Sequence, residues 1–188
     1  MDVENRRKID LSSYVRGRYS PGRPFFVLAA WQLVNLLVIR NPFNPFAGLR
    51  RFALRAFGAR IGKGVVLRPG MRVKFPWNLA IGDHSWIGED VWIDNLASVE
   101  IGGDVCVSQG AYLCTGNHDW SDPAFGIYVL PIRIEDGAWV GARSTIGPGA
   151  RIGTHAVIAM GSTVHGHAEA WKIHSGSPAQ AVKDRKVS

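Results

Sequence analysis

A branched aliphatic residue recurs every six positions through most of this 188-residue chain, and this period limits its fold more than any other feature. The positions that carry it are Ile61, Leu67, Val73, Ile81, Ile87, Ile93, Val99, Ile101, Val107, Leu113, Ile134, Val140, Ile146, Ile152, Ile158 and Val164. Six residues are too few for a strand and a crossover helix, but they suffice for one short strand and a sharp corner. Three such units close a triangular coil of about eighteen residues, and stacked coils bury a continuous aliphatic ladder. The period therefore predicts an all-β solenoid in which each coil depends on its neighbours.

The positive charge of the chain is concentrated at its N-terminal end. Residues 1–60 contain eleven Lys or Arg and three Asp or Glu (11 − 3 = +8), whereas residues 61–188 contain eleven and twelve (11 − 12 = −1), which gives the net charge of +7. The length is typical of one domain. Cys106 and Cys114 both fall inside the repeats, so we interpret them as packing residues of a reduced compartment rather than as a disulfide. The N-terminus does not show the pattern of a secretory signal.

The basic segment, residues 1–60, contains two stretches that predict helices. The apolar run 25–39 is fifteen residues long, shorter than the roughly twenty that cross a membrane, so it predicts a buried or interfacial helix. The stretch 48–58 is amphipathic. Helical spacing places its three arginines away from an apolar face that is formed by Leu49, Phe52, Ala53, Ala56 and Phe57. Two interpretations stay open: the helices cover the first coil, or they contact an anionic membrane surface. Nucleic-acid binding is not indicated, because no recognised motif accompanies the charge.

Two interruptions of the period indicate where function would lie. The first, 74–80, adds two residues and shifts the phase of the repeat. The second begins after Leu113, and the period resumes only near residues 132–134. Loops that protrude from a regular scaffold frequently carry function. His118 lies at the start of this loop, where a neutral imidazole can act as a general base.

Four segments together resemble the hexapeptide-repeat O-acetyltransferases, in particular the colanic acid branch, which is related to the maltose, galactoside and nodulation-factor acetyltransferases. They are PWNLAIGDHSWIGEDVWIDNLA (76–97), SQGAYLCTGNHDWSDPAF (108–125), IEDGAWVGARSTIGPGARIG (134–153) and SGSPAQAV (175–182). The resemblance implies a left-handed parallel β-helix over residues 61–182, with a short α-helical segment at 1–60, a protruding loop at about 117–131 and a tail at 183–188. The hand comes from the resemblance, because the spacing alone does not specify it.

The same resemblance implies acetyl transfer from acetyl-CoA, the co-substrate, to a sugar hydroxyl, with no metal required. His118 corresponds to the general base of the family, and the backbone N–H of Ala142, which follows a Trp-Val-Gly motif, corresponds to the donor that stabilises the oxyanion. No acyl-enzyme is needed, so Cys114 is not expected to be a nucleophile. The expected acceptor-binding residues are Asp94, Asn95, Asp119 and Trp120. Each has a structural alternative: an ordinary turn for the first two, a loop cap for Asp119 and packing for Trp120.

In the family, acetyl-CoA lies in a groove between neighbouring subunits, so the resemblance implies a homotrimer. The residues expected to line this groove or its adenine end are Trp139, Gly141, Ala142, Ala159, Gly161, Ser177, Pro178 and Lys183. The expected partner is a carbohydrate of exopolysaccharide or oligosaccharide biosynthesis, in free or lipid-linked form. We therefore expect a cytoplasmic enzyme, and residues 1–60 are candidates for peripheral contact with the inner face of the membrane.

Three alternative functions stay open. The first keeps the fold and the chemistry but changes the acceptor to the hydroxyl of a small metabolite or xenobiotic. The second is a zinc protein similar to the γ-carbonic anhydrases, which bind zinc through three histidines; His84 and His118 are present, but the second histidine expected shortly after the loop histidine is missing. His165 and His167 are interpreted as exposed turn residues. The third, a non-catalytic scaffold, is disfavoured by the intact loop around His118 and by the Trp-Val-Gly-Ala motif.

Overall fold

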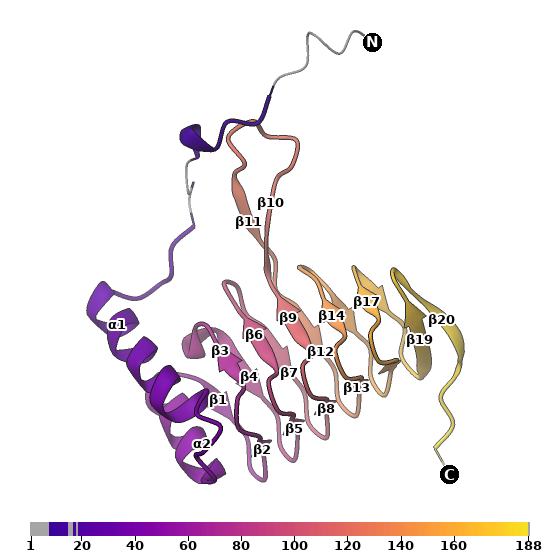
Figure 1. Cartoon of the computed structure of the whole chain (residues 1–188). Coiled ribbons are helices and arrows are strands. Elements are labelled where there is room, and N and C mark those ends of the chain that lie inside the picture. The colour runs from indigo at the N-terminus through magenta and orange to yellow at the C-terminus, as the bar shows by residue number, and fades with distance from the viewer. Residues whose placement is uncertain (1–7, 15–16, 18, 188) are drawn as a thin grey trace, which may run out of the picture.

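The computed structural model describes residues 8–14, 17 and 19–187, and it shows a β-helix that is covered at its N-terminal end by two helices (Figure 1). The helical elements are α1 (Phe25–Val34), a π-helical turn (Asn35–Ile39) that continues it, α2 (Ala47–Ala56), and 3-10 turns at Leu11–Ser13 and Pro76–Asn78. Helices are thus present over both stretches that predict them, with closely matching bounds.

Short strands form the three sides of the β-helix. Sheet A contains β1 (Arg60–Ile61), β4 (Leu79–Ile81), β7 (Val99–Ile101), β12 (Ile132–Ile134), β15 (Arg151–Ile152) and β18 (His167–Ala168). Sheet B contains β2 (Val66–Leu67), β5 (Trp86–Ile87), β8 (Cys106–Val107), β13 (Trp139–Val140), β16 (Val157–Ile158), β19 (Lys172–Gly176) and β20 (Ala179–Asp184). Sheet C contains β3 (Arg72–Val73), β6 (Trp92–Asp94), β9 (Tyr112–Cys114), β14 (Thr145–Ile146) and β17 (Thr163–Val164). The arrangement is the left-handed parallel β-helix that the family resemblance implies.

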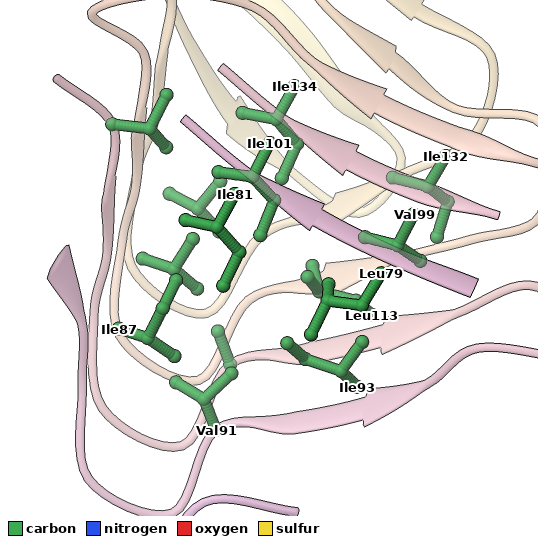
Figure 2. Packing of buried hydrophobic residues seen from close by; sticks show 14 of the residues in the cluster. Leu79, Ile81, Ile87, Val91, Ile93, Val99, Ile101, Leu113, Ile132 and Ile134 are labelled. Carbon is green, nitrogen blue, oxygen red and sulfur yellow. The ribbon is translucent and has the colours of Figure 1, made fainter. Parts of the chain in front are cut away.

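The repeat places at least one aliphatic side chain of every strand from β1 to β9 and from β12 to β17 inside the β-helix. In sheet A the residues that stack in register and are buried are Ile61, Ile81, Ile101, Ile134 and Ile152. Figure 2 shows part of this column beside a second one, formed by Leu79, Val99 and Ile132. The second column lengthens the first coils to twenty residues (81 − 61 and 101 − 81), rather than the predicted eighteen. The extra residues lie at the corner between sheets C and A, where they shift the phase of the repeat.

The helices cap the first coil through side-chain hydrogen bonds. The strand N–H groups of the first coil donate to carbonyls of the second coil, as Gly62 N does to Ile81 O at 2.8 Å. Among the described elements, no strand precedes the first coil, so no strand N–H is available to donate to its carbonyls. Such carbonyls need donors from elsewhere. The donors are Arg55 to Ile61 O (2.7 Å), Arg51 to Val65 O (3.0 Å), Arg50 to Leu67 O (2.8 Å) and the indole of Trp31 to Val73 O (3.1 Å). At least one carbonyl on each side of the triangle is satisfied in this way.

The inward face of α2 differs in part from the one predicted, for Ala53 is buried and Phe57 packs against the core as expected. Leu49 and Phe52 are 46% and 69% exposed, whereas Arg50 and Leu54 are buried. Burial lowers the pKa of the Arg50 guanidinium, which is held by carbonyls and not by a carboxylate. The prediction that the arginines point away from the packed face was wrong because the open carbonyls of the first coil attract guanidinium donors more specifically than they attract apolar side chains.

The long interruption after Leu113 forms a β-hairpin that projects from the body (Figure 1). β10 (Gly116–His118) pairs antiparallel with β11 (Ile127–Val129), so part of the expected loop is regular. The N-terminal strap, residues 8–14, reaches this hairpin, where Asp10 N donates to Pro123 O at 2.9 Å. At the other end β20 folds back on β19 and reaches Asp184, within the expected tail. Among the described helices, none combines the length and apolar character required to traverse a bilayer.

Candidate active site

His118 is the last residue of β10 and is half-buried at the point where the hairpin leaves its paired strands. Its Nδ1 lies 2.8 Å from the carbonyl oxygen of Phe125 across the hairpin. Because a carbonyl oxygen only accepts, Nδ1 carries the proton and Nε2 keeps its lone pair in the neutral imidazole. The backbone of the hairpin therefore selects the tautomer in which Nε2 is the basic nitrogen.

Two aromatic rings position this imidazole, and the sequence did not reveal either of them. The ring of Phe125 stacks on it with centroids 4.4 Å apart and an interplanar angle of 9°, and Tyr14 from the N-terminal strap lies 6.0 Å away. Phe125 has φ of 53°, a left-handed conformation that is unusual for a residue with a side chain. This backbone conformation belongs to the tight turn that brings its carbonyl and its ring to His118. No periodic signal marks either position.

Asp119 caps the loop and does not orient the imidazole. Its Oδ1 accepts from Ser121 N at 2.9 Å and from Ser121 Oγ at 2.6 Å, and these hydrogen bonds lower the pKa of the carboxyl. Its backbone N–H donates to Gly126 O. Trp120 is 78% exposed beside it and is free to contact a bound molecule. The structure thus places the two loop residues near His118 and gives the orienting role to Phe125.

Asp94 and Asn95 have different surroundings, although they are adjacent in the sequence. Asp94 ends β6, with Lys74 Nζ 2.9 Å from its Oδ1 and the Tyr112 hydroxyl 3.3 Å from its Oδ2. Burial, followed by the neighbouring Cys114 and Asp94, raises the pKa of Tyr112, so its hydroxyl remains a donor. Asn95 is fully buried, and its amide accepts from Phe75 N and donates to Phe75 O. The acceptor-binding role predicted for Asn95 does not fit this geometry, because its amide is already bonded within the core.

The predicted oxyanion donor lies at the corner between sheets B and C. Gly141 N donates to Ile158 O and Arg143 N donates to Gln109 O, but among the described residues no acceptor is bonded to Ala142 N. Ala142 O accepts from Gly161 N at 2.9 Å. This hydrogen bond joins the corner to the equivalent corner of the next coil, which contains Ala159. Only glycine fits at Gly141, since a Cβ there would lie 2.6 Å from the Ile158 oxygen. The corner therefore offers an unpaired backbone N–H on a closely packed support.

The other residues expected near acetyl-CoA lie along sheet B and its end. Trp139 in β13 is half-exposed, and its indole donates to Ser108 Oγ at 2.9 Å. Ser177 and Pro178 are exposed in the turn between β19 and β20, and Lys183 is exposed in β20. These residues and the corner at Ala142 lie on neighbouring parts of one side of the β-helix.

Within one chain, His118 and Ala142 lie at opposite ends of sheet C. Leu113 of β9 pairs with Ile146 of β14; His118 follows Leu113 by five residues and Ala142 precedes Ile146 by four. The base and the candidate oxyanion donor of one chain therefore lie beyond opposite ends of the paired strands β9 and β14.

The histidines, acidic residues and cysteines of the described ranges are dispersed. Over residues 8–14, 17 and 19–187, no group of three or more His, Cys, Asp and Glu side chains is placed to hold a metal ion. Cys106 and Cys114 are both free. The thiol of Cys114 lies 3.1 Å from the carbonyl oxygen of Gly116, in the strand that leads to His118.

Comparison with known proteins agrees with the fold and the repeat. Residues 131–166 match the family model described as bacterial transferase hexapeptide (six repeats). The chain is 39% identical over 176 residues to an Escherichia coli K12 protein assigned to colanic acid biosynthesis as the acetyltransferase WcaF, covering 94% of this chain and 97% of that one. The chain therefore belongs to the hexapeptide-repeat acetyltransferase family.

Two solved structures share the fold at low sequence identity. A hexapeptide-repeat-containing acetyltransferase from Vibrio cholerae, complexed with acetyl-CoA, has a TM-score of 0.78 at 23% identity, covering 86% of this chain and 88% of that one. A maltose O-acetyltransferase from Clostridium difficile 630 has a TM-score of 0.74 at 22% identity, covering 87% of this chain and 90% of that one. Both likenesses therefore cover more than four fifths of each chain.

Proposed function

We propose that this protein transfers the acetyl group of acetyl-CoA to a hydroxyl of a carbohydrate acceptor, with His118 as the general base. The observation that carries the proposal is the hydrogen bond from His118 Nδ1 to the Phe125 carbonyl, which leaves Nε2 basic. The acetyl-CoA bound in the Vibrio cholerae structure supports the donor. Similarity to WcaF and to a maltose O-acetyltransferase supports a sugar acceptor, and the former supports a place in exopolysaccharide biosynthesis.

In the proposed reaction, Nε2 of His118 takes the proton of the acceptor hydroxyl as its oxygen attacks the thioester carbonyl. A carbon–oxygen bond forms and the carbonyl becomes a tetrahedral oxyanion. Collapse of this intermediate breaks the carbon–sulfur bond, and the proton held by His118 passes to the departing thiolate. The products are an acetyl ester and the CoA thiol, so no acyl-enzyme on Cys114 is required.

The unpaired N–H of Ala142 is the proposed donor to the oxyanion. A backbone N–H that is already in place stabilises developing charge without reorganisation. Because Ala142 and His118 lie beyond opposite ends of strands β9 and β14 in one chain, we propose that the Ala142 corner of one subunit faces His118 of its neighbour in a homotrimer. The residues proposed to line the acetyl-CoA groove are Trp139, Gly141, Ala142, Ala159, Gly161, Ser177, Pro178 and Lys183.

The test is release of CoA thiol from acetyl-CoA in the presence of a panel of glycans. His118→Ala should lower kcat on the best acceptor by about 10²- to 10⁴-fold, the range for loss of a general base. His167→Ala is the matched control, and it should keep near-native turnover because His167 is exposed in β18 on sheet A, outside the proposed site. Near-native turnover by His118→Ala would exclude the proposed base.

We further propose that the outer face of the cap contacts an anionic membrane surface. The apolar side chains exposed there are Phe25, Phe26, Leu33, Leu36, Leu37, Phe43, Phe46, Leu49 and Phe52. Arg23 and Arg40 bracket the run from Phe25 to Ile39. Apolar side chains beside cations suit the interface of an anionic bilayer. Arg50, Arg51 and Arg55 contribute less to this attraction, because they donate to the first coil.

Membrane contact is tested by sedimentation with phosphatidylglycerol-containing vesicles. Deletion of residues 1–60 would uncap the first coil, so surface substitutions are preferable. The triple variant Phe25→Ser, Phe43→Ser and Phe52→Ser should reduce vesicle binding severalfold, whereas Val182→Ser, an exposed apolar position at the far end, should not. Equal binding by the triple variant and the native chain would rule out this surface.

A further inference from the structure

A groove lies between the helical cap and sheet C, apart from the His118 hairpin. It is open to solvent and has a volume of about 190 Å³. The cap side is lined by Gln32, Asn35 and Arg40. The facing side is lined by residues of β3, of β6 and of the segment after β3, chiefly Arg72, Lys74, Trp92 and Asp94. The π-helical turn that begins at Asn35 forms part of its wall. Such turns are rare and occur frequently at functional sites.

The groove carries more positive than negative charge. Arg40, Arg72 and Lys74 face a single carboxylate, that of Asp94. Only Lys74 is paired with it, at 2.9 Å. In the part of the chain that the structure describes, neither Arg40 nor Arg72 has a carboxylate within 4.0 Å, so two guanidinium groups are available to an anion. Guanidinium groups bind phosphate oxygens in a bidentate manner.

One buried oxygen at the groove also lacks a hydrogen-bond donor. Asn35 is only 6% exposed, and its Oδ1 has no donor among the described residues. Oδ1 of Asp94, in contrast, is neutralised by the Lys74 ammonium 2.9 Å away. Buried polar atoms are normally satisfied, so the Asn35 oxygen indicates a missing donor. A hydroxyl group is a donor of the required kind.

Trp92 provides an apolar wall between the charged groups and the strand that leads to His118. Its ring lies 4.7 Å from that of Tyr112, and the Arg72 guanidinium lies 5.8 Å from its centroid. Rings held in this way pack against the C–H faces of sugars. Asp94 pairs with Cys114, four residues before His118, so the groove is about 13 Å of extended chain from the proposed base.

We propose that this groove binds the phosphate-bearing end of the acceptor, so that the acceptor is a glycosyl phosphate rather than a free sugar. Arg40 and Arg72 would hold the phosphate, Asn35 would accept from a sugar hydroxyl, and Trp92 would pack against the ring. The separation from His118 suits an acceptor of more than one sugar, whose phosphate lies in the groove while a distant hydroxyl reaches the base. This inference rests on the proposed function, because the bound molecule is an acceptor only if the protein transfers acetyl groups to carbohydrates. Its test measures binding and does not require catalysis.

The first measurement is calorimetric binding of maltose 1-phosphate, maltose and inorganic phosphate to the intact protein without acetyl-CoA. Maltose 1-phosphate should bind at least about tenfold more tightly than maltose or inorganic phosphate, as expected for added charge-assisted hydrogen bonds. Arg40→Gln and Arg72→Gln should each remove most of this preference. Arg133→Gln, which removes an exposed arginine on sheet A, is the matched control and should retain it. Thermal unfolding of each variant shows that the fold is retained.

Any of three results would overturn the proposal: equal binding of maltose and maltose 1-phosphate, equal binding of inorganic phosphate and maltose 1-phosphate, or unchanged preference in Arg40→Gln and Arg72→Gln. Loss of CoA affinity alone in these variants would also overturn it, because the groove would then serve the phosphates of CoA. Since binding is measured without turnover, failure of acetyl transfer would refute the proposed function and leave this result intact.

Glycosyl phosphates occur as nucleotide sugars and as lipid diphosphates, and a second measurement separates these sources. UDP-glucose in solution and farnesyl-diphosphate-linked glucose in neutral phosphatidylcholine vesicles are compared, each with native protein and with Arg72→Gln. The ligand that represents the natural acceptor, either UDP-glucose or the lipid-linked glucose, should bind more tightly than maltose to the native protein. In Arg72→Gln its affinity should fall to that of maltose. If neither ligand binds better than maltose, the groove is not a glycosyl phosphate site.

Discussion

The helical cap and the β10–β11 hairpin both lie outside the aliphatic ladder, but their hydrogen bonds between side chains and backbone have different roles. In the cap, side chains satisfy backbone carbonyls, because Arg50, Arg51 and Trp31 donate to carbonyls of the first coil. In the hairpin, a backbone carbonyl orients a side chain, because the Phe125 carbonyl accepts from His118 Nδ1. Changes in the cap should therefore alter stability, whereas changes in the hairpin should alter activity with little effect on stability.

The largest effect is expected at Arg50. Arg50→Leu leaves the carbonyls of Leu67 and Asn44 without their donor in a buried position, which should lower the free energy of unfolding by roughly 2–5 kcal/mol. Arg60→Leu is the matched control, because Arg60 is exposed at the first strand, and its effect should stay within about 0.5 kcal/mol. Urea denaturation measures both. Equal stabilities would show that the guanidinium cap is dispensable.

The next effect is expected at the corner that supports Ala142. A Cβ on Gly141 would lie 2.6 Å from both the Ile158 oxygen and the Met160 nitrogen, so Gly141→Ala should destabilise by about 1–3 kcal/mol and displace the proposed oxyanion donor. Gly166→Ala is the control: Gly166 has φ of +82° and open space around it, so only the backbone strain of about 1 kcal/mol is expected there. Thermal unfolding and kcat together separate packing from catalysis. Full activity in Gly141→Ala would contradict a role for this corner.

A smaller effect, confined to activity, is expected at Phe125. Phe125→Ala removes the ring stacked on His118 but keeps the carbonyl, so kcat should fall about tenfold while stability changes by less than about 1 kcal/mol. The imidazole ¹⁵N chemical shifts of His118 report whether Nδ1 keeps its proton. An unchanged kcat would mean that the carbonyl alone positions the imidazole.

The smallest effect is expected on the surface of the β-helix body, at Glu135. Hydrogen bonds from Arg151, and then from Thr154, lower its pKa from the ordinary value of 4.5. Because the native-state pKa lies below the unfolded-state value, the stabilisation is complete above that value and is lost as pH falls through the native-state pKa. Glu135→Gln should therefore lower stability by at most about 1 kcal/mol at neutral pH, and the difference should shrink below about pH 4.5. Denaturation curves at several pH values test this, and a pH-independent difference would exclude the titration of Glu135 as its cause.

Much of the architecture could be predicted from local pattern. The period identified the buried ladder, the apolar run identified the helix over residues 25–39, and the break after Leu113 identified the projecting segment with His118. The direction of Arg50 and the burial of Asn95 could not be predicted in this way. Both depend on partners distant in the sequence, Leu67 for Arg50 and Phe75 for Asn95, which become available only when coils stack.

A stacked β-solenoid, a helical N-terminal segment and the position of the long interruption follow from the spacing of apolar residues along a few neighbouring turns. Which polar groups meet depends instead on how the coils and helices pack. Carbonyls of the first coil have no strand among the described residues to donate to them, so they accept from arginines of α2. The turn at Phe125 brings its carbonyl within hydrogen-bond distance of His118. Hydrogen bonds need specific atoms at specific distances, and a periodic pattern of apolar residues carries no information about them.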